Sequence, residues 1–171
     1  MLAPQIFKAN DIRGIVVGDH PEWDADGARA LGAAFVELLG PGEFVLGRDM
    51  RVLGRELSLA FADGARRAGA SVVDIGLSST DQLWFASGWL GLPGVQFTAS
   101  HNPASYNGVK FCLADARPVP ADFMARLRDI AATVTLGAEP TGGYRELDAL
   151  EAYADKLSDL VPPTGERGLT V

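Results

Sequence analysis

The sequence predicts an α/β protein, a three-layer α/β/α sandwich around a mixed, mostly parallel sheet. Short apolar runs with strand character alternate with segments in which apolar residues recur at helical spacing, and glycine or proline separates them. Strands that alternate with helices favour a mostly parallel sheet with helices on both faces. The chain segment after Ser100 is too short to hold a crossover helix, so the strands that flank it are expected to be antiparallel.

The first half of the chain predicts two helices and two strands. Asp24 or Asp26 is expected to cap the first helix, which glycine and proline end at residues 40–42. A strand over residues 43–46 and a second helix that stops at Gly69 follow. The inward stripes of the two helices are Ala28, Leu31, Phe35 and Leu38, and then Leu57, Phe61, Ala65 and Ala68. Residues 72–75 form the next predicted strand.

The second half continues this alternation. Thr80 is expected to cap a third helix that ends near Trp89, and the segment 91–94 breaks it. Two strands are predicted over residues 95–99 and 109–113. Two further helices are marked by Phe123, Leu127 and Ile130, and by Leu147, Leu150, Tyr153 or Ala154, Leu157 and Leu160. A loop separates these helices at residues 137–143, and residues 162–165 are predicted to be a linker.

Composition and charge exclude several classes of protein. Hydrophobic residues make up 47% and charged residues 22%, which suits a globular domain with one core. The net charge of −7 argues against nucleic acid or a membrane surface as a partner, because both attract basic proteins. No apolar run is long enough to cross a bilayer, and no apolar export signal opens the chain. A single cysteine, Cys112, is consistent with a reducing compartment, so we expect a cytoplasmic protein.

The strongest functional signal is the segment 98–111, which reads TASHNPASYNGVKF. It places Ser100 at the end of an apolar strand and directly before a polar turn, where its hydroxyl would face a ligand. The segment resembles the phosphoserine loop of the α-D-phosphohexomutases. Residues 7–14, FKANDIRG, resemble the N-terminal signature of that family in its phosphomannomutase/phosphoglucomutase branch. The block GRDMR at residues 47–51 lies between them in the expected order.

The resemblance implies a domain of a longer enzyme. It covers nearly the whole chain but only the first of the family's four domains. We therefore expect domain 1 over residues 1–146, followed over residues 147–171 by an interdomain helix, a linker and the start of domain 2. The last three residues, 169–171, look like the opening of a strand. The implied partners are hexose phosphates and domains 2–4 of the same parent chain.

The implied reaction interconverts hexose 1-phosphate and hexose 6-phosphate through a phosphoserine and a hexose 1,6-bisphosphate. Glucose 1,6-bisphosphate or mannose 1,6-bisphosphate would serve as activator. A phosphoserine adds almost two negative charges, so it needs hydrogen-bond donors and usually a divalent cation. The family binds Mg²⁺ through a phosphoserine oxygen and an aspartate-rich loop of domain 2. Ser100, through its phosphate, would be the one metal ligand in this chain, and the fragment alone is expected to be inactive.

The resemblance also assigns residue roles. Ser100 would carry the phosphoryl group, Arg13 and Lys110 would approach it, and Lys110 or His101 would move the proton of the sugar hydroxyl. The expected catalytic residues are Ser100, His101, Lys110 and Arg13, and the expected substrate-binding residues are Asn102 and Arg48. Positive charge from Arg13, Arg48, Arg51 and Lys110 gathers at the family motifs of an acidic chain, as an anionic substrate requires.

Structural interpretations stand beside these functional ones. Ser-His-Asn-Pro is by composition a turn, and His101 could only orient it. An ion pair that fixes a loop explains Arg48 and Asp49 equally well. The preference for mannose or glucose stays open. The main alternative is a stand-alone domain that binds phosphosugars or another protein without turnover.

Overall fold

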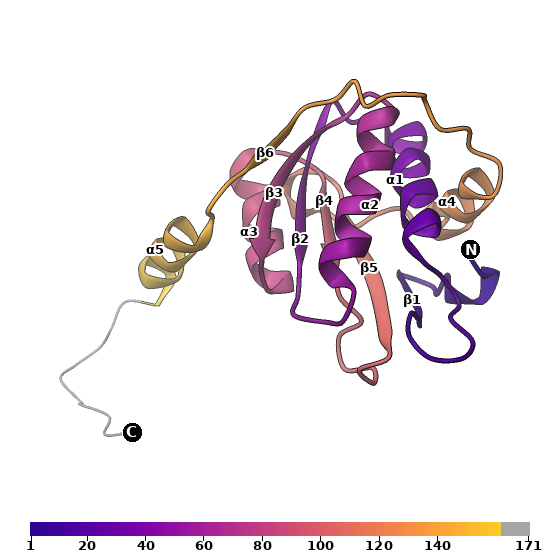
Figure 1. The fold of residues 1–171 in the computed structure, drawn as a ribbon. Coiled ribbons are helices and arrows are strands. Elements are labelled where there is room, and N and C mark those ends of the chain that lie inside the picture. The colour runs from indigo at the N-terminus through magenta and orange to yellow at the C-terminus, as the bar shows by residue number, and fades with distance from the viewer. Residues whose placement is uncertain (162–171) are drawn as a thin grey trace.

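The computed structural model describes residues 1–161 and confirms the three-layer α/β/α sandwich. A six-stranded sheet forms the middle layer, in the order β1-β5-β4-β2-β3-β6. In chain order the strands are β1 (Asp11–Ile15), β2 (Glu43–Arg48), β3 (Ser71–Leu77), β4 (Gly94–Phe97), β5 (Tyr106–Cys112) and β6 (Tyr144–Glu146). Helices α1 (Ala25–Leu39), α2 (Gly54–Arg67) and α4 (Phe123–Ala131) lie on one face, and α3 (Thr80–Leu90) lies on the other (Figure 1).

The sheet is mixed and mostly parallel, as predicted. Strand β2 pairs in parallel with β3 and β4, and β3 pairs in parallel with β6. Strand β5 runs antiparallel to both β4 and β1. The antiparallel β4–β5 pair confirms the expectation for the chain segment after Ser100. Because β2 and β4 are parallel, Arg48 at the end of β2 and the Ser100 loop after β4 lie at the same edge of the sheet.

Helix caps follow the predicted chemistry with one correction. The Asp24 carboxylate accepts a hydrogen bond from the Gly27 N–H at 2.9 Å and caps α1, and Gly40 ends the helix in the left-handed region with φ of 61°. The predicted cap of α3 at Thr80 is wrong, because the Ser79 hydroxyl accepts from the Gln82 N–H at 3.1 Å. Thr80 is instead the first helical residue.

Two short strands were not expected from the sequence. Strand β1 alternates Asp11 and Arg13 with apolar residues over only five positions, and β6 has three residues that are all exposed. Such short segments carry little periodic signal, and their pairing with β5 and β3 defines them instead.

The final helix, α5 (Leu150–Leu160), begins later than predicted. Leu147 lies before it and packs against a small cluster around Leu83. None of the α5 residues is buried, although the Tyr153 ring lies 5.5 Å from that of Phe85. Figure 1 shows α5 apart from the sheet. The predicted linker at 162–165 and strand onset at 169–171 lie outside the described residues, and the division between residues 146 and 147 stays a prediction.

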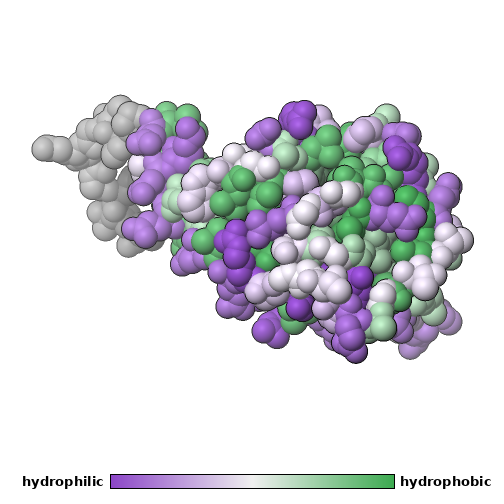
Figure 2. Space-filling view, turned by 90° about the horizontal axis from the view of Figure 1, so that it is seen from above, coloured by the Kyte–Doolittle hydropathy of each residue, from purple (hydrophilic) through white to green (hydrophobic). Residues whose placement is uncertain are grey.

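The main core lies between the sheet and helices α1, α2 and α4. Phenylalanine side chains from α1, α2 and three strands form its centre: Phe35, Phe44, Phe61, Phe97 and Phe111. Helices α1 and α2 approach so closely that a Cβ at Gly32 or Gly64 would collide with the backbone of the opposite helix. On the outside, polar and apolar residues are interspersed in the view from above (Figure 2). In residues 1–161, no helix is long and apolar enough to cross a membrane.

One carboxylate joins α1 to α2 and sets a pH dependence. Burial raises the pKa of Asp63, but hydrogen bonds from Arg67 and Arg29 outweigh it and hold the pKa below the usual 3.8. Since the folded-state pKa is lowered, the ion pairs stabilise the protein above about pH 4, and this stability is lost as the pH falls through the lowered pKa.

We therefore predict that Asp63→Asn lowers the free energy of unfolding by about 1 kcal/mol at pH 7. Urea denaturation of both proteins between pH 7 and pH 2.5 measures the difference, which should shrink as wild-type Asp63 is protonated. A difference of equal size throughout this range would contradict the ion-pair explanation.

Candidate active site

Ser100 lies on the exposed loop that joins β4 to β5. The preceding residues Thr98 and Ala99 are buried, whereas Ser100 is exposed and has φ of 56°. This left-handed conformation costs a residue other than glycine about 1–2 kcal/mol, so the surrounding contacts must hold it. The Ser100 N–H donates to the Thr98 hydroxyl at 2.9 Å, and Ser100 Oγ lies 3.4 Å from Nδ1 of His101. The loop thus turns the Ser100 backbone sharply and leaves the residue open to solvent.

The side chain of Arg51 holds this loop in shape. Its Nη2 donates to the carbonyl oxygens of Ser100 and Asn102, both at 2.7 Å. Its Nη1 donates to the carbonyl oxygens of Pro103 and Tyr106, at 2.9 and 3.0 Å. The Arg51 side chain is only 12% exposed, although its bonds to Ser100 and Pro103 lie at the exposed side of the loop. One guanidinium therefore fixes four backbone positions of the loop.

Two further side chains support Arg51 and the base of the loop. The Asp49 carboxylate accepts from the Arg51 backbone N–H at 3.0 Å and pairs with its Nε at 3.5 Å. The Asn107 amide donates to the Val52 carbonyl at 3.0 Å, and its oxygen accepts from the Gly108 N–H at 2.8 Å. The turn after β2 is therefore tied to both ends of the Ser100 loop. This placement agrees with the structural interpretation of Asp49.

A charged network brings three of the predicted residues together. The Asp11 carboxylate accepts from Nε and Nη2 of Arg13 at 2.9 and 2.8 Å, and Lys110 Nζ lies 3.4 Å from it. The Nη1 of Arg13 donates to the side-chain oxygen of Asn102 at 2.9 Å. Asn102 belongs to the Ser100 loop, so the network joins Arg13 and Lys110 to that loop. Two cations share one carboxylate, which leaves a net positive charge for an anionic ligand.

Strand register explains why these side chains meet. Asp11 lies opposite Lys110 in the β1–β5 pair, and Lys110 lies opposite Gln96 in the β5–β4 pair. Side chains of directly opposed residues share one face of a sheet. Cys112, two residues after Lys110, has its Sγ 3.4 Å from Oγ of Ser87 in α3, so the network lies on the α3 face. Burial raises the pKa of the Cys112 thiol, which suits a packing residue and not a reactive thiol.

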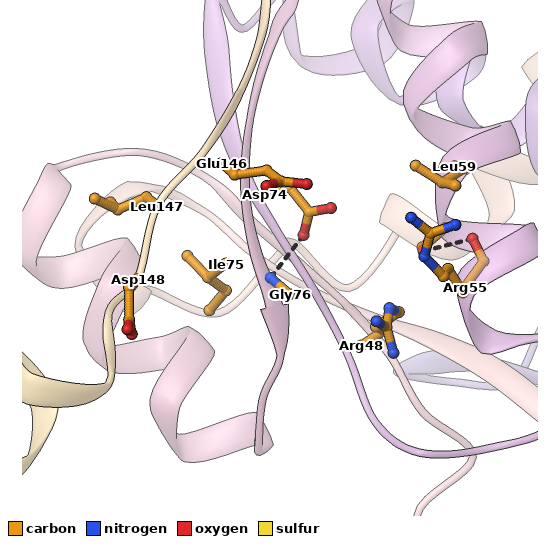
Figure 3. A pocket seen from close by; sticks show the side chains of 10 residues that line it. Arg48, Arg55, Leu59, Asp74, Ile75, Gly76, Glu146, Leu147 and Asp148 are labelled. Atoms are coloured by element: carbon orange, nitrogen blue, oxygen red, sulfur yellow. Dashed lines mark hydrogen bonds between the residues drawn. The ribbon is translucent and has the colours of Figure 1, made fainter.

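Arg48 does not join the network. It lies on β2 at the same parity as Phe44 and Leu46, which belong to the main core, so it projects toward α2 instead of α3. There it lines a separate cavity of about 310 Å³ with Arg55 on one side and acidic residues on the other (Figure 3). The acidic residues are Asp74, Glu146 and Asp148. Among residues 1–161, the predicted site therefore divides into a cluster of five residues and Arg48, which projects from the opposite face of the sheet.

Sequence reasoning gave no role to two residues of this site. Asp11 sits inside the motif FKANDIRG, whose alternation of charged and apolar residues is the signal for its position beside Arg13. Arg51 ends the block GRDMR, which was noted only as a source of positive charge. Within the described residues, no group of three or more His, Cys, Asp or Glu side chains is arranged to hold a metal ion.

Comparison with known proteins agrees with the fold and shows the family. The sequence model of phosphoglucomutase/phosphomannomutase, alpha/beta/alpha domain I, matches residues 4–137. A phosphomannomutase of Salmonella montevideo is 41% identical over 158 residues, which cover 88% of this chain and 34% of the relative. A phosphomannomutase of Klebsiella pneumoniae is 40% identical over 87% of this chain and 96% of the relative.

A crystal structure of a phosphoglucomutase/phosphomannomutase family protein from Burkholderia thailandensis superposes with a TM-score of 0.79 and 33% identity. The alignment covers 93% of this chain and 36% of that one. The chain thus spans about a third of the length of the Salmonella and Burkholderia proteins. It belongs to the phosphoglucomutase/phosphomannomutase family, of which it contains the α/β/α domain I.

Proposed function

We propose that this chain is the phosphoserine domain of a phosphomannomutase/phosphoglucomutase that interconverts hexose 1-phosphate and hexose 6-phosphate. The observation that carries the proposal is the exposed Ser100 on a loop that Arg51 fixes and that Asn102 joins to Arg13 and Lys110. A displacement at phosphorus needs positioned partners and neutralised charge more than covalent chemistry from the protein. The loop would supply the positioning, and the cations the neutralisation.

The reaction would proceed in two transfers. A hydroxyl of the hexose monophosphate attacks the phosphorus on Ser100, its proton passes to Lys110 or His101, the bond between phosphorus and Ser100 Oγ breaks, and Oγ takes up a proton. The resulting hexose 1,6-bisphosphate, after reorientation, is attacked at its other phosphorus by Ser100 Oγ, which gives up its proton. The bond from that phosphorus to the sugar breaks, the sugar oxygen takes up a proton, and the isomeric monophosphate leaves.

Arg13 and Lys110 would stabilise charge on the oxygens of the transferring group. Asp11 keeps their charged ends together, so little reorganisation is needed when the phosphoryl group arrives. His101 Nδ1 lies 3.4 Å from the Ser100 hydroxyl oxygen, and His101 is exposed, so a substrate hydroxyl could reach it.

Residues 1–161 do not provide a complete set of Mg²⁺ ligands. Mg²⁺ prefers six oxygen ligands, and it typically takes them from carboxylates, phosphates and water. The carboxylate of the site, Asp11, is occupied by two cations, and no acidic group of the described residues forms a metal cluster. A phosphate on Ser100 would supply one ligand, and the others would come from further domains of the enzyme. The same domains would bind the sugar hydroxyls and the second phosphate.

We predict that Ser100→Ala lowers kcat of the enzyme that contains this domain by about a thousandfold or more, because the covalent carrier is removed. The assay measures the conversion of glucose 1-phosphate to glucose 6-phosphate by coupling it to oxidation of the glucose 6-phosphate. Ser105→Ala is the matched control, since Ser105 lies on the same loop and its backbone carbonyl, not its side chain, accepts from Val16. Normal turnover by Ser100→Ala would refute the proposal.

We further predict that Arg51→Ala lowers kcat about ten- to a hundredfold with a smaller change in KM, because the misplaced loop stabilises the transition state less well. Amide hydrogen exchange of residues 100–106 should become faster in the variant. Arg55→Ala serves as control, because Arg55 is an exposed arginine of α2 that makes no side-chain contact with the loop among the described hydrogen bonds. Unchanged exchange and turnover in Arg51→Ala would show that the loop keeps its conformation without Arg51.

The 171-residue chain alone is predicted to fold but to lack turnover. Residues 1–161 form a six-stranded sheet with a buried core, and no group of three or more His, Cys, Asp or Glu side chains among them could hold a metal ion. Circular dichroism tests folding, and the coupled assay with Mg²⁺ and glucose 1,6-bisphosphate tests activity. Turnover near that of an ordinary enzyme, about 10 per second, would contradict this prediction.

A further inference from the structure

The cavity that contains Arg48 lies where ligand sites are common in α/β folds. Strands β2 and β3 are parallel neighbours, and the helices that follow them, α2 and α3, cover opposite faces of the sheet. Chain segments that leave adjacent strands toward opposite faces open a crevice at the carboxyl ends of those strands. The cavity of about 310 Å³ occupies this crevice (Figure 3). None of residues 98–106, which hold Ser100, lines it.

A bulge in β3 interrupts the strand pairing at this crevice. Leu46 lies opposite Asp74, but Arg48 lies opposite Leu77, so β3 has one residue more than β2 over this stretch. Gly76 lies in the bulge with φ of 70°, and its N–H donates to the Asp74 carboxylate at 2.7 Å. Bulges bend a strand and redirect its side chains, and they are common beside binding sites.

The guanidinium of Arg48 is half-buried and has no partner within residues 1–161. In every other half-buried arginine of these residues, the guanidinium donates at least one hydrogen bond to the protein. These arginines are Arg13, Arg29, Arg51, Arg66 and Arg67. Withdrawing a charge from water without an acceptor is unfavourable. The position of Arg48 therefore suits an anion that residues 1–161 do not themselves supply.

The opposite wall of the cavity carries an unpaired carboxylate. Asp74 and Glu146 are partners in the β3–β6 pair, and Asp74 is also the partner of Leu46, so both carboxylates share the α2 face with Arg48. The Asp74 carboxylate is occupied by the Gly76 N–H and by the Tyr144 hydroxyl. Burial and the neighbouring carboxylates raise the pKa of Tyr144, so this hydroxyl keeps its proton. Glu146 makes no side-chain hydrogen bond or ion pair among the described residues, and it is exposed.

We propose that this cavity binds a small zwitterion, a phosphate or carboxylate joined by a short link to an ammonium group. The anionic end would lie on Arg48 and the ammonium end on Glu146. The site is separate from Ser100, and the inference does not rest on the proposed function.

The charges of the lining favour a zwitterion over simpler ions. A ligand with only negative charge would face the acidic wall, and one with only positive charge would face Arg48. The volume lies near the lower end for small-molecule pockets, about 300 Å³. The backbones of β2 and β6 are two strand spacings apart, about 10 Å. Because the Arg48 and Glu146 side chains extend from these two strands, a link of a few atoms between the charged groups is favoured.

The test is an NMR titration of the ¹⁵N-labelled 171-residue chain with O-phosphoethanolamine and with ethyl phosphate. The two probes share the phosphate and a two-carbon chain, but only phosphoethanolamine carries an ammonium group. Both should shift the Arg48 side-chain resonance and the Gly76 amide resonance. Ethyl phosphate should bind about two- to fivefold more weakly, because it cannot pair with the exposed Glu146.

Variants assign each end of the ligand. Arg48→Gln should weaken both probes about tenfold or more, because it removes charge-assisted hydrogen bonds to the phosphate. Glu146→Gln, at an exposed position, should make the two probes bind equally. Glu151→Gln changes an exposed acidic residue of α5 outside the cavity and should alter neither affinity. Circular dichroism and the indole resonance of the buried Trp23 check that each variant folds. If Arg48→Gln does not fold, Glu146→Gln alone decides.

Distinct results would refute the site. Shifts confined to the region of Arg13 and Lys110 would show that the cavity does not bind the anion. Equal binding of the two probes by the wild type, or an unchanged difference in Glu146→Gln, would show that Glu146 does not recognise the ammonium group. Calorimetry should also show that Arg48→Gln weakens phosphoethanolamine in the enzyme that contains this domain. An effect in the 171-residue chain but not in that enzyme would mean that another part of the enzyme fills the cavity.

Discussion

The contact between Arg51 and the Ser100 loop is the interaction on which the site depends. Four backbone carbonyls converge on a single guanidinium that is largely shielded from water. Without it, the left-handed conformation of Ser100 would lack a compensating contact at its own carbonyl. Asp49 in turn fixes Arg51, and Asn107 ties the next strand to the same turn. The serine is thus positioned by the end of β2, although it follows β4 directly in the chain.

The two faces of the sheet have different roles. The α1–α2–α4 face holds the phenylalanine core and supplies most of the apolar burial. The α3 face carries Asp11, Arg13 and Lys110 beyond the small cluster around Leu83. Because side chains alternate along β1 and β5, the same two strands contribute Ile12 and Val109 to the core and charged groups to the site. The main core and the proposed phosphate site therefore lie on opposite sides of the same strands.

Much of this could be predicted from the sequence, and the exceptions have physical reasons. Helix α1 is capped at both ends, and α1 and α2 both have long apolar stripes, so their patterns are strong. Strand β1 is short and charged, and only its pairing with β5 defines it. The Arg51 contacts join residues about fifty positions apart, which no local pattern encodes. Arg48 shares a motif with Arg51, yet the alternation of β2 turns it toward α2.

The most direct test of the central claim is to locate the phosphoryl group itself. The enzyme that contains this domain should be exposed to glucose 1,6-bisphosphate, digested and mapped by peptide mass spectrometry. A positioned carrier serine predicts a single phosphate on Ser100, and a lower yield of that phosphopeptide in Arg51→Ala. Phosphate on Ser105 instead, or an active enzyme with none on Ser100, would contradict the account.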